Sequence, residues 1–158
     1  MAPAPYHNRD GKESFIPVSR NNSEKENPNP VFKMLMEEQV GLTFSQQGTR
    51  ETVLPGYMGL ITQIDDHLGD LFDFLEKEGK KDETMIVFTS DHGDYHGDHW
   101  MGEKELFHDV AVKITLIIFD PRQEADQSRG TECNDLDEAM DLRQTFIEAK
   151  ELKDQNQR

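Results

Sequence analysis

Six acidic and imidazole side chains crowd into nine residues directly after an apolar run, and their types suit metal chemistry. The run is MIVFTS, residues 85–90, and the side chains after it are those of Asp91, His92, Asp94, His96, Asp98 and His99. Carboxylates bind hard cations such as Ca²⁺, Mg²⁺ and Mn²⁺, and imidazole binds Mn²⁺, Zn²⁺ and Fe²⁺. The mixture is typical of a divalent-metal site, or of a polar loop that is rich in histidine.

Spacing excludes two common metal motifs here. His92 and His96 are four residues apart, but the neighbouring glycines disfavour the helix that a zinc-binding pair would need. Counted from Asp91, the twelfth position of an EF-hand is Gly102, where that motif requires glutamate. The cluster is therefore neither a helical zinc site nor an EF-hand.

Position along the chain divides these side chains into two groups. Ligands of open α/β sheets bind beyond the carboxyl ends of the strands, and Asp91 and His92 follow the apolar run directly. We expect these two to be metal ligands. His96 and His99 lie further along, where loop hydrogen bonds or solvent exposure explain them better, so they are secondary candidates.

The next segment, WMGEKELFHD, adds a cation. Lys104 follows Asp91 by 13 residues, so a loop of this length can fold back over the strand end. A lysine aimed at a metal-bound anion would stabilise developing negative charge, although spacing alone fits an exposed surface lysine better. Glu103 and His108 have the same standing, and His108 is a third secondary candidate.

Hydrophobic periodicity predicts the elements that position this loop. Apolar residues recur every three or four positions between Glu51 and Gly79, which predicts an amphipathic helix. Residues 84–90 and 111–120 read as buried strands, and residues 136–152 as a second helix. Buried strands between helices predict an α/β fold with a mostly parallel sheet.

The first fifty residues differ in character. Five of the seven prolines fall within residues 1–30, so we expect an irregular arm that buries little surface. Residues 31–40 are expected to form a short helix, and residues 43–50 a polar loop.

Charge and composition exclude some functions. The net charge of −15 argues against nucleic acid or an anionic membrane as a partner, because both need a basic surface. No apolar segment approaches the length of about 20 residues that a membrane span needs. The single cysteine allows no disulfide within the chain, and the N-terminus does not resemble a signal peptide, so we expect a cytoplasmic location.

The segments IVFTSDHGDYHGDHWMGEKELFHD, LIIFDP and YMGLITQIDDHLGDLFDFLE together resemble the sulfatase branch of the alkaline phosphatase superfamily, especially the phosphonate monoester hydrolases and arylsulfatases. The resemblance covers roughly residues 1 to 150. It implies that Asp91 and His92 ligate one divalent metal (Ca²⁺, Mn²⁺ or Mg²⁺) and that Lys104 contacts the sulfuryl or phosphoryl oxygens. The implied reaction is hydrolysis of a sulfate, phosphate or phosphonate monoester by a formylglycine nucleophile.

The chain departs from this family pattern in several places. Formylglycine forms from Cys or Ser in the motif C/S-x-P/A-x-R, and Cys133 lies instead in CNDLD. Thr115 stands where the family usually has proline, and the metal-ligand aspartates of the family's first strand have no counterpart. We therefore expect a partial alkaline phosphatase-like α/β sandwich, with two or three strands and two main helices, over residues 51–152, and a polar tail over 153–158.

Two functions stay open on this basis. The first is a metal-dependent hydrolase of small sulfate, phosphate or phosphonate esters. In this case the chain carries only part of the active site and is expected to be inactive alone. The second is a non-catalytic module that binds a divalent metal weakly or needs another chain to complete its sheet. A truncated gene, an incomplete gene model or a domain fragment would each give this pattern.

Overall fold

The computed structural model describes residues 2–9, 11, 15–135 and 137–149. The chain divides into two compact units, with the boundary between Arg122 and Gln123. All the candidate site residues belong to the first unit, which is described first.

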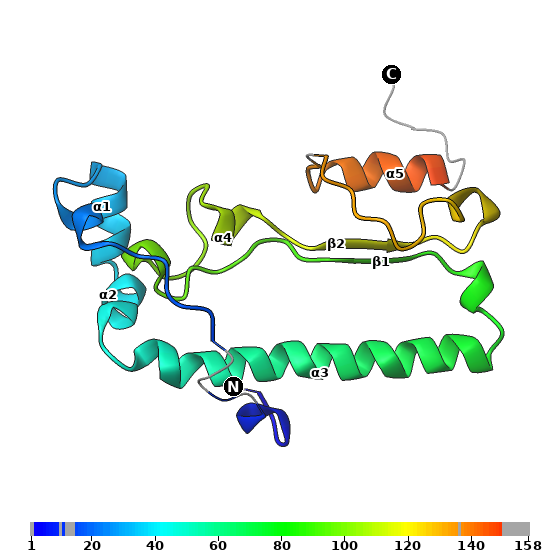
Figure 1. Ribbon diagram of the computed structural model, residues 1–158, viewed down its shortest axis with the longest axis horizontal. Coiled ribbons are helices and arrows are strands. Elements are labelled where there is room, and N and C mark those ends of the chain that lie inside the picture. Colours follow the sequence, from blue (N-terminus) through cyan, green and yellow to red (C-terminus); the bar gives the residue numbers. More distant parts are fainter. Residues whose placement is uncertain (1, 10, 12–14, 136, 150–158) are drawn as a thin grey trace. The chain divides into compact units, whose positions relative to one another are not determined.

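The longest element of the first unit is helix α3, Thr49–Lys77 (Figure 1). Its apolar residues follow the spacing of three and four, and the helix predicted between Glu51 and Gly79 is confirmed. Gly79 has a φ of 65°, in the left-handed region that suits the residue after a helix end. Its amide donates to the Glu76 carbonyl at 3.1 Å, so the helix ends as the sequence suggests.

Helices α1, Pro30–Glu37, and α2, Gln39–Ser45, precede α3. Pro30 occupies the first turn of α1, where no amide hydrogen is needed, and the Asn29 side chain accepts a hydrogen bond from the Val31 amide at 2.9 Å. The expected short helix is thus present but breaks at Glu38. Because α2 continues to Ser45 and α3 begins at Thr49, the polar loop expected over 43–50 is wrong for most of its length.

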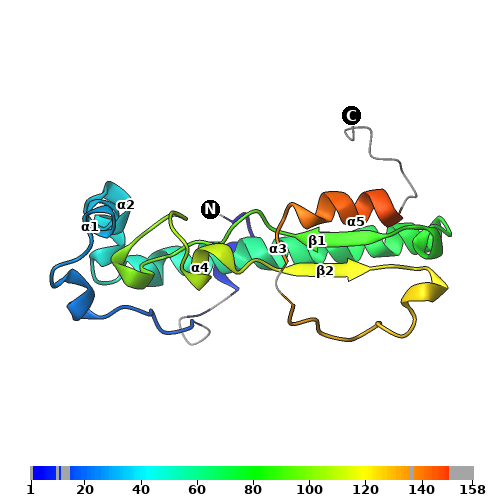
Figure 2. The same ribbon diagram turned by 90° about the horizontal axis from the view of Figure 1, so that it is seen from above.

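The sheet consists of strands β1, Ile86–Thr89, and β2, Leu116–Phe119, which lie side by side (Figures 1 and 2). The two strands pair antiparallel, with Ile86 opposite Phe119, so the expectation of mostly parallel strands is wrong for this pair. A parallel pair needs a crossover, usually through a long helix. The connection here carries only the one-turn helix α4, Asp109–Val112, which also replaces the start of the strand expected over 111–120.

The strands and α3 keep much apolar surface exposed. Ile117 retains 59% of its accessible surface and Ile118 retains 45%, so β2 is not a buried strand as expected. The buried cluster of this unit lies instead between α1 and the loop that follows β1. It contains Leu35, Tyr95, Met101 and Ala111.

The N-terminal arm is irregular, as predicted, with short 3-10 turns at Tyr6–Asn8 and Asn22–Lys25. As expected, it buries little surface, with Ala2 the one buried residue among those described in the arm, but it docks at two places. Its first turn packs on α3 so closely that a Cβ on Gly59 would lie 2.3 Å from the Tyr6 carbonyl oxygen. Further along, the Ser19 amide donates to Asp98 Oδ1 at 2.8 Å, which ties the arm to the loop after β1.

The second unit contains a turn at Gln123–Ala125 and helix α5, Asp141–Ala149. The helix predicted over 136–152 is confirmed only from Asp141, whose side chain accepts from the Glu138 amide at 2.8 Å. Residues 136 and 150–152, like the predicted polar tail, lie outside the described residues. Among the helices that are described, none combines the length and apolar character needed to cross a bilayer.

Candidate functional site

The side chains of Asp91, His92 and Lys104 meet just beyond the end of β1. Lys104 Nζ lies 2.9 Å from His92 Nε2, and His92 Nε2 lies 3.3 Å from Asp91 Oδ2. The loop of residues 93–103 folds back on itself to bring the lysine to this point. The three residues singled out from the sequence are therefore neighbours in space.

Hydrogen bonding fixes which nitrogen of His92 carries the proton. Nδ1 lies 2.8 Å from the Gly93 carbonyl oxygen, which can only accept, so Nδ1 is the donor. Nε2 then presents a lone pair and accepts from the Lys104 ammonium. A carbonyl that accepts from the second ring nitrogen is the usual support of a metal-binding histidine.

The backbone of Gly93 is itself held in place. Its amide donates to the Ala111 carbonyl at 2.8 Å, which links the loop to α4. A Cβ on Gly93 would lie 1.8 Å from the Val110 carbonyl oxygen, so only glycine allows this approach. The orientation of the His92 ring thus depends on close packing between two backbone segments.

Asp91 presents an ionised carboxylate to the solvent. Hydrogen bonds from the backbone amides of Asp91 and His92 lower the pKa of the Asp91 carboxyl below its ordinary value. Its Oδ2 and the His92 Nε2 lone pair are both electron-pair donors, and donors this close together favour a shared cation. Oxygen plus imidazole nitrogen fits Mn²⁺ and, with more oxygen ligands, Ca²⁺ or Mg²⁺.

The donor set is incomplete. Among the described residues, no group of three or more His, Cys, Asp or Glu side chains is arranged to hold a metal. Asp91 and His92 are therefore at most two ligands of a larger set.

The His96 side chain packs against aromatic rings. It lies between the rings of Phe44 and Tyr57, with centroid distances of 5.7 and 4.4 Å. Nδ1 is 3.5 Å from Asp94 Oδ1, and burial, which outweighs the attraction to Asp94, lowers the pKa of His96. These contacts account for the residue without ligation.

His99 and His108 form a separate stacked pair, with ring centroids 4.0 Å apart. His99 Nδ1 donates to Glu24 Oε1 at 2.8 Å, and His108 Nδ1 shares a hydrogen bond with the Tyr95 hydroxyl at 2.8 Å. Burial, with repulsion from His99, lowers the pKa of His108. Burial raises the pKa of Glu24, but hydrogen bonds from the Asn21 amide and His99 leave it lowered overall.

The loop that carries Lys104 contains residues in strained backbone conformations, and hydrogen bonds with the N-terminal arm help to hold it. Five non-glycine residues have positive φ here: His96, His99, Trp100, Glu103 and Leu106. Such conformations persist only where surrounding contacts enforce them, and they are frequent at functional sites. The arm supplies some of these contacts, since the His99 amide donates to the Ser19 carbonyl and the Trp100 indole N–H donates to the Asn21 carbonyl, each at 2.8 Å.

Comparison with known proteins agrees with the resemblance noted from the motifs. The family model described as "Sulfatase" matches residues 6–149, nearly the whole chain. The chain belongs to the sulfatase family.

Relatives of this sulfatase-family chain include an alkaline phosphatase superfamily protein and an arylsulfatase. It is 32% identical over 161 residues to the "Multifunctional alkaline phosphatase superfamily protein PehA" of Trinickia caryophylli, covering 94% of this chain and 31% of that protein. It is 30% identical over 92 residues to an arylsulfatase of Clostridium perfringens, covering 58% of this chain and 19% of that protein.

A solved structure supports the α/β fold class. The phosphonate monoester hydrolase SpPMH of Silicibacter pomeroyi superposes with a TM-score of 0.67 at 29% identity, covering 77% of this chain and 26% of that one. The sulfatase-family chain therefore spans less than a third of the length of these relatives. The predicted fold class, a partial alkaline phosphatase-like domain, is confirmed.

Sequence reasoning missed the residues that support the site. Glu24 and Trp100 have partners far away in the sequence, since His99 and Glu24 are 75 positions apart, and Tyr95 bonds His108, 13 positions away, in a loop without periodicity. The one local signal is Gly97, whose φ of 96° marks a tight turn in the loop.

Proposed function

We propose that this chain provides the anion-contacting lysine and two metal ligands of a hydrolase acting on small sulfate, phosphate or phosphonate monoesters. The observation that carries the proposal is the meeting of Lys104, His92 and Asp91 at the end of β1. Sulfatase-family membership and the relatives named as an arylsulfatase and a phosphonate monoester hydrolase support this class of substrate.

Each side chain has a distinct part in this proposal. The Lys104 ammonium binds the non-bridging oxygens of the ester and stabilises the negative charge that grows on them. The Asp91 carboxylate and His92 Nε2 would hold a divalent cation, which when bound neutralises charge and orients the reactants. The Gly93 carbonyl keeps the His92 ring turned so that its lone pair faces the site.

The nucleophile is not among these residues. No segment of the sequence matches C/S-x-P/A-x-R, and the exposed Cys133 is in a different context. Covalent catalysis needs an activated nucleophile, so we expect the chain alone to bind metal and anion without turnover.

A second candidate function is a non-catalytic module that associates with another chain. The observation that favours it is the exposed apolar surface of β2, including Ile117 and Ile118. Turnover of p-nitrophenyl sulfate or of a p-nitrophenyl phenylphosphonate ester by the purified chain would reject this alternative and would also overturn our expectation of inactivity.

The metal part of the proposal is tested by calorimetry with Mn²⁺ and Ca²⁺. We expect binding heat for the native chain and none for the double variant Asp91→Asn, His92→Gln. A matched control changes the exposed helical residues His67→Gln and Asp73→Asn, which alters charge and composition equally and should leave the heat intact. Equal heats in the double variant and the native chain would refute the assignment of these ligands.

The anion part is tested with inorganic phosphate and sulfate in the Mn²⁺-loaded chain. Lys104→Met should weaken anion binding by about tenfold or more, since a charged hydrogen bond contributes about 1.5–3 kcal/mol. The control is Lys113→Met, another exposed lysine of the same unit. Loss of affinity in both variants would indicate only a general effect of net charge.

A further inference from the structure

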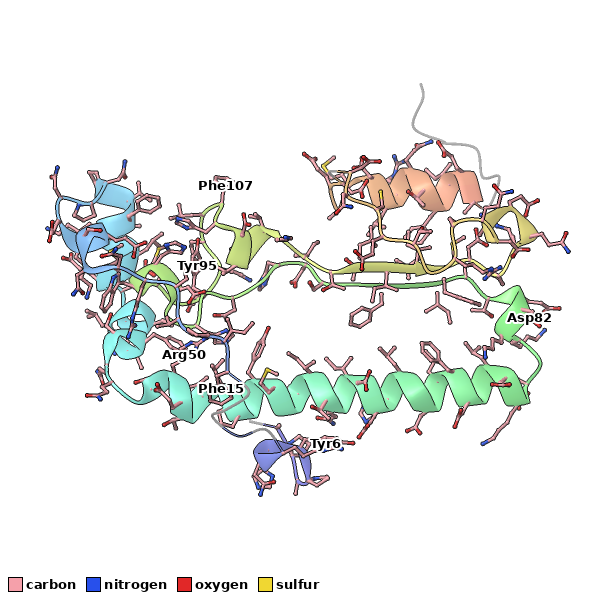
Figure 3. The ribbon with its side chains drawn as sticks, viewed as in Figure 1. Tyr6, Phe15, Arg50, Asp82, Tyr95 and Phe107 are labelled. Carbon is pink, nitrogen blue, oxygen red and sulfur yellow. The ribbon has the colours of Figure 1, made fainter. Side chains whose placement is uncertain are left out.

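Tyr95 and Met101 are the two most deeply buried large side chains near the site. Of the two, Tyr95 is the polar one. It retains 1% of its accessible surface and packs with Leu35, Met101 and Ala111. In Figure 3 Tyr95 lies within the loop region, whereas Phe107, from the same loop, points outward and is 89% exposed. A tyrosine this deeply buried must satisfy its hydroxyl group within the protein.

The polar groups of Tyr95 reach both sides of Lys104 along the chain. The Tyr95 amide donates to the Glu103 carbonyl at 2.8 Å, immediately before the lysine. The Tyr95 hydroxyl bonds His108 Nδ1 at 2.8 Å, four residues after it. One rigid residue thus anchors both ends of the segment 104–107.

This segment needs such anchors. Glu103 and Leu106 have φ values of 58° and 71°, which non-glycine residues adopt only under external constraint. Leu106 packs against the buried cluster, but Phe107 gives no support. The position of Lys104 therefore depends on the two ends of the segment together with the packing of Leu106.

The second anchor extends beyond Tyr95. The His108 ring stacks on His99, which is held by Glu24 of the arm. The metal-ligand candidates are fixed through the backbone, because the Gly93 amide donates to the Ala111 carbonyl and the Ala111 amide donates to the His108 carbonyl rather than to its ring. Loosening the Tyr95–His108 bond should therefore affect the lysine and spare Asp91 and His92.

We propose that Tyr95 is a positioning residue that holds Lys104 beside the metal-ligand candidates, through its backbone bond to Glu103 and its hydroxyl bond to His108. The inference rests on the proposed role of Lys104 in contacting a tetrahedral oxyanion. It adds a residue that touches neither substrate nor metal and that sets anion affinity.

The test is Tyr95→Phe, which removes the hydroxyl and keeps the buried ring. In the Mn²⁺-loaded chain, we expect the dissociation constant of inorganic phosphate to rise about two- to tenfold, as for the loss of one hydrogen bond. The Mn²⁺ dissociation constant should stay unchanged. The control is Tyr57→Phe, which removes the hydroxyl of a half-exposed tyrosine and should change neither constant.

His108 variants distinguish positioning from a loss of stability. His108→Asn keeps a hydrogen-bonding group near the place of Nδ1 and should retain phosphate affinity in part. His108→Leu removes it and should match Tyr95→Phe, and the Tyr95→Phe, His108→Leu double variant should be no weaker than either single variant. Additive losses in the double variant would overturn the proposal, as would parallel losses of Mn²⁺ and phosphate affinity.

Lys104→Met separates this inference from the function on which it rests. If Lys104→Met weakens phosphate binding but Tyr95→Phe and His108→Leu do not, the positioning role is wrong and the anion role of Lys104 stands. If Lys104→Met has no effect, the proposed function fails and the positioning role fails with it.

Discussion

Replacing Gly93 by alanine tests whether the site depends on close backbone packing. The added Cβ would lie 1.8 Å from the Val110 carbonyl oxygen and 2.9 Å from its carbon, so one backbone segment must move. Overpacking of this kind costs about 1–3 kcal/mol. The movement also breaks the 2.8 Å hydrogen bond from the Gly93 amide to Ala111, which adds about 1 kcal/mol. We expect a loss of about 2–4 kcal/mol in the free energy of unfolding.

The same movement displaces the carbonyl that orients His92. Because changes in the groups that orient a metal ligand reduce metal affinity by about 10–100-fold, Gly93→Ala should weaken Mn²⁺ binding in that range. Urea unfolding followed by circular dichroism measures the stability, and calorimetry at a temperature where the variant is folded measures the affinity.

Gly69→Ala is the matched control for Gly93→Ala. Gly69 lies in α3 with open space around its Cβ position, so alanine there should raise stability by up to about 1 kcal/mol and leave metal binding unchanged. The reasoning is refuted if Gly93→Ala stays within about 0.5 kcal/mol of the native chain, the usual range of an uninvolved surface change.

Three further predictions concern the arm and the histidines. Gly59→Ala should lower the free energy of unfolding, measured by urea unfolding, by about 1–2 kcal/mol, because the added Cβ would lie 2.3 Å from the Tyr6 carbonyl oxygen. Gly69→Ala, in the same helix, should not lower it. Equal gains in stability in both variants would show that the arm is not docked at Gly59. The pKa of His96 is lowered from 6.5 in the folded state, so the unfolded chain binds the proton first and the free energy of unfolding should fall as pH drops below about 6.5. His96→Gln should flatten this part of the profile of stability against pH. An unchanged slope would contradict the assignment. Glu24 has a lowered pKa, so its contribution to stability is present above about pH 4.5 and lost as pH falls below that value. Glu24→Gln should lower the free energy of unfolding by about 1 kcal/mol at pH 7 and by little at pH 3. A loss that does not depend on pH would indicate lost packing instead.

Local pattern in the sequence was sufficient for some of this architecture. Helix α3 follows from the spacing of its apolar residues, and its end follows from Gly79. Strand β1 ends where its polar residues begin, so Asp91 and His92 lie just beyond it, and the family resemblance added Lys104, whose Nζ lies 2.9 Å from His92 Nε2. The direction of β2 did not follow, because a short apolar strand has the same composition in parallel and antiparallel pairs.

Long-range contacts were beyond the reach of local pattern. The proline-rich arm reads as irregular, which is correct, but irregular backbone can still dock when its amides and carbonyls find partners. Ser19 exchanges two such hydrogen bonds with Asp98 and His99, about 80 positions away. The hydroxyl of Tyr95 and the carboxylate of Glu24 likewise act through partners that no periodicity predicts.

Trp100 lies at this docking point, with the Lys25 ammonium 3.5 Å and the Arg20 guanidinium carbon 4.3 Å from the ring centroid. It is the only tryptophan in the sequence. The protein consequently contains an optical reporter at one defined place. Its ultraviolet emission should shift to longer wavelength when the arm leaves the loop and water reaches the indole, so unlabelled protein can reveal whether metal or oxyanion binding tightens this junction.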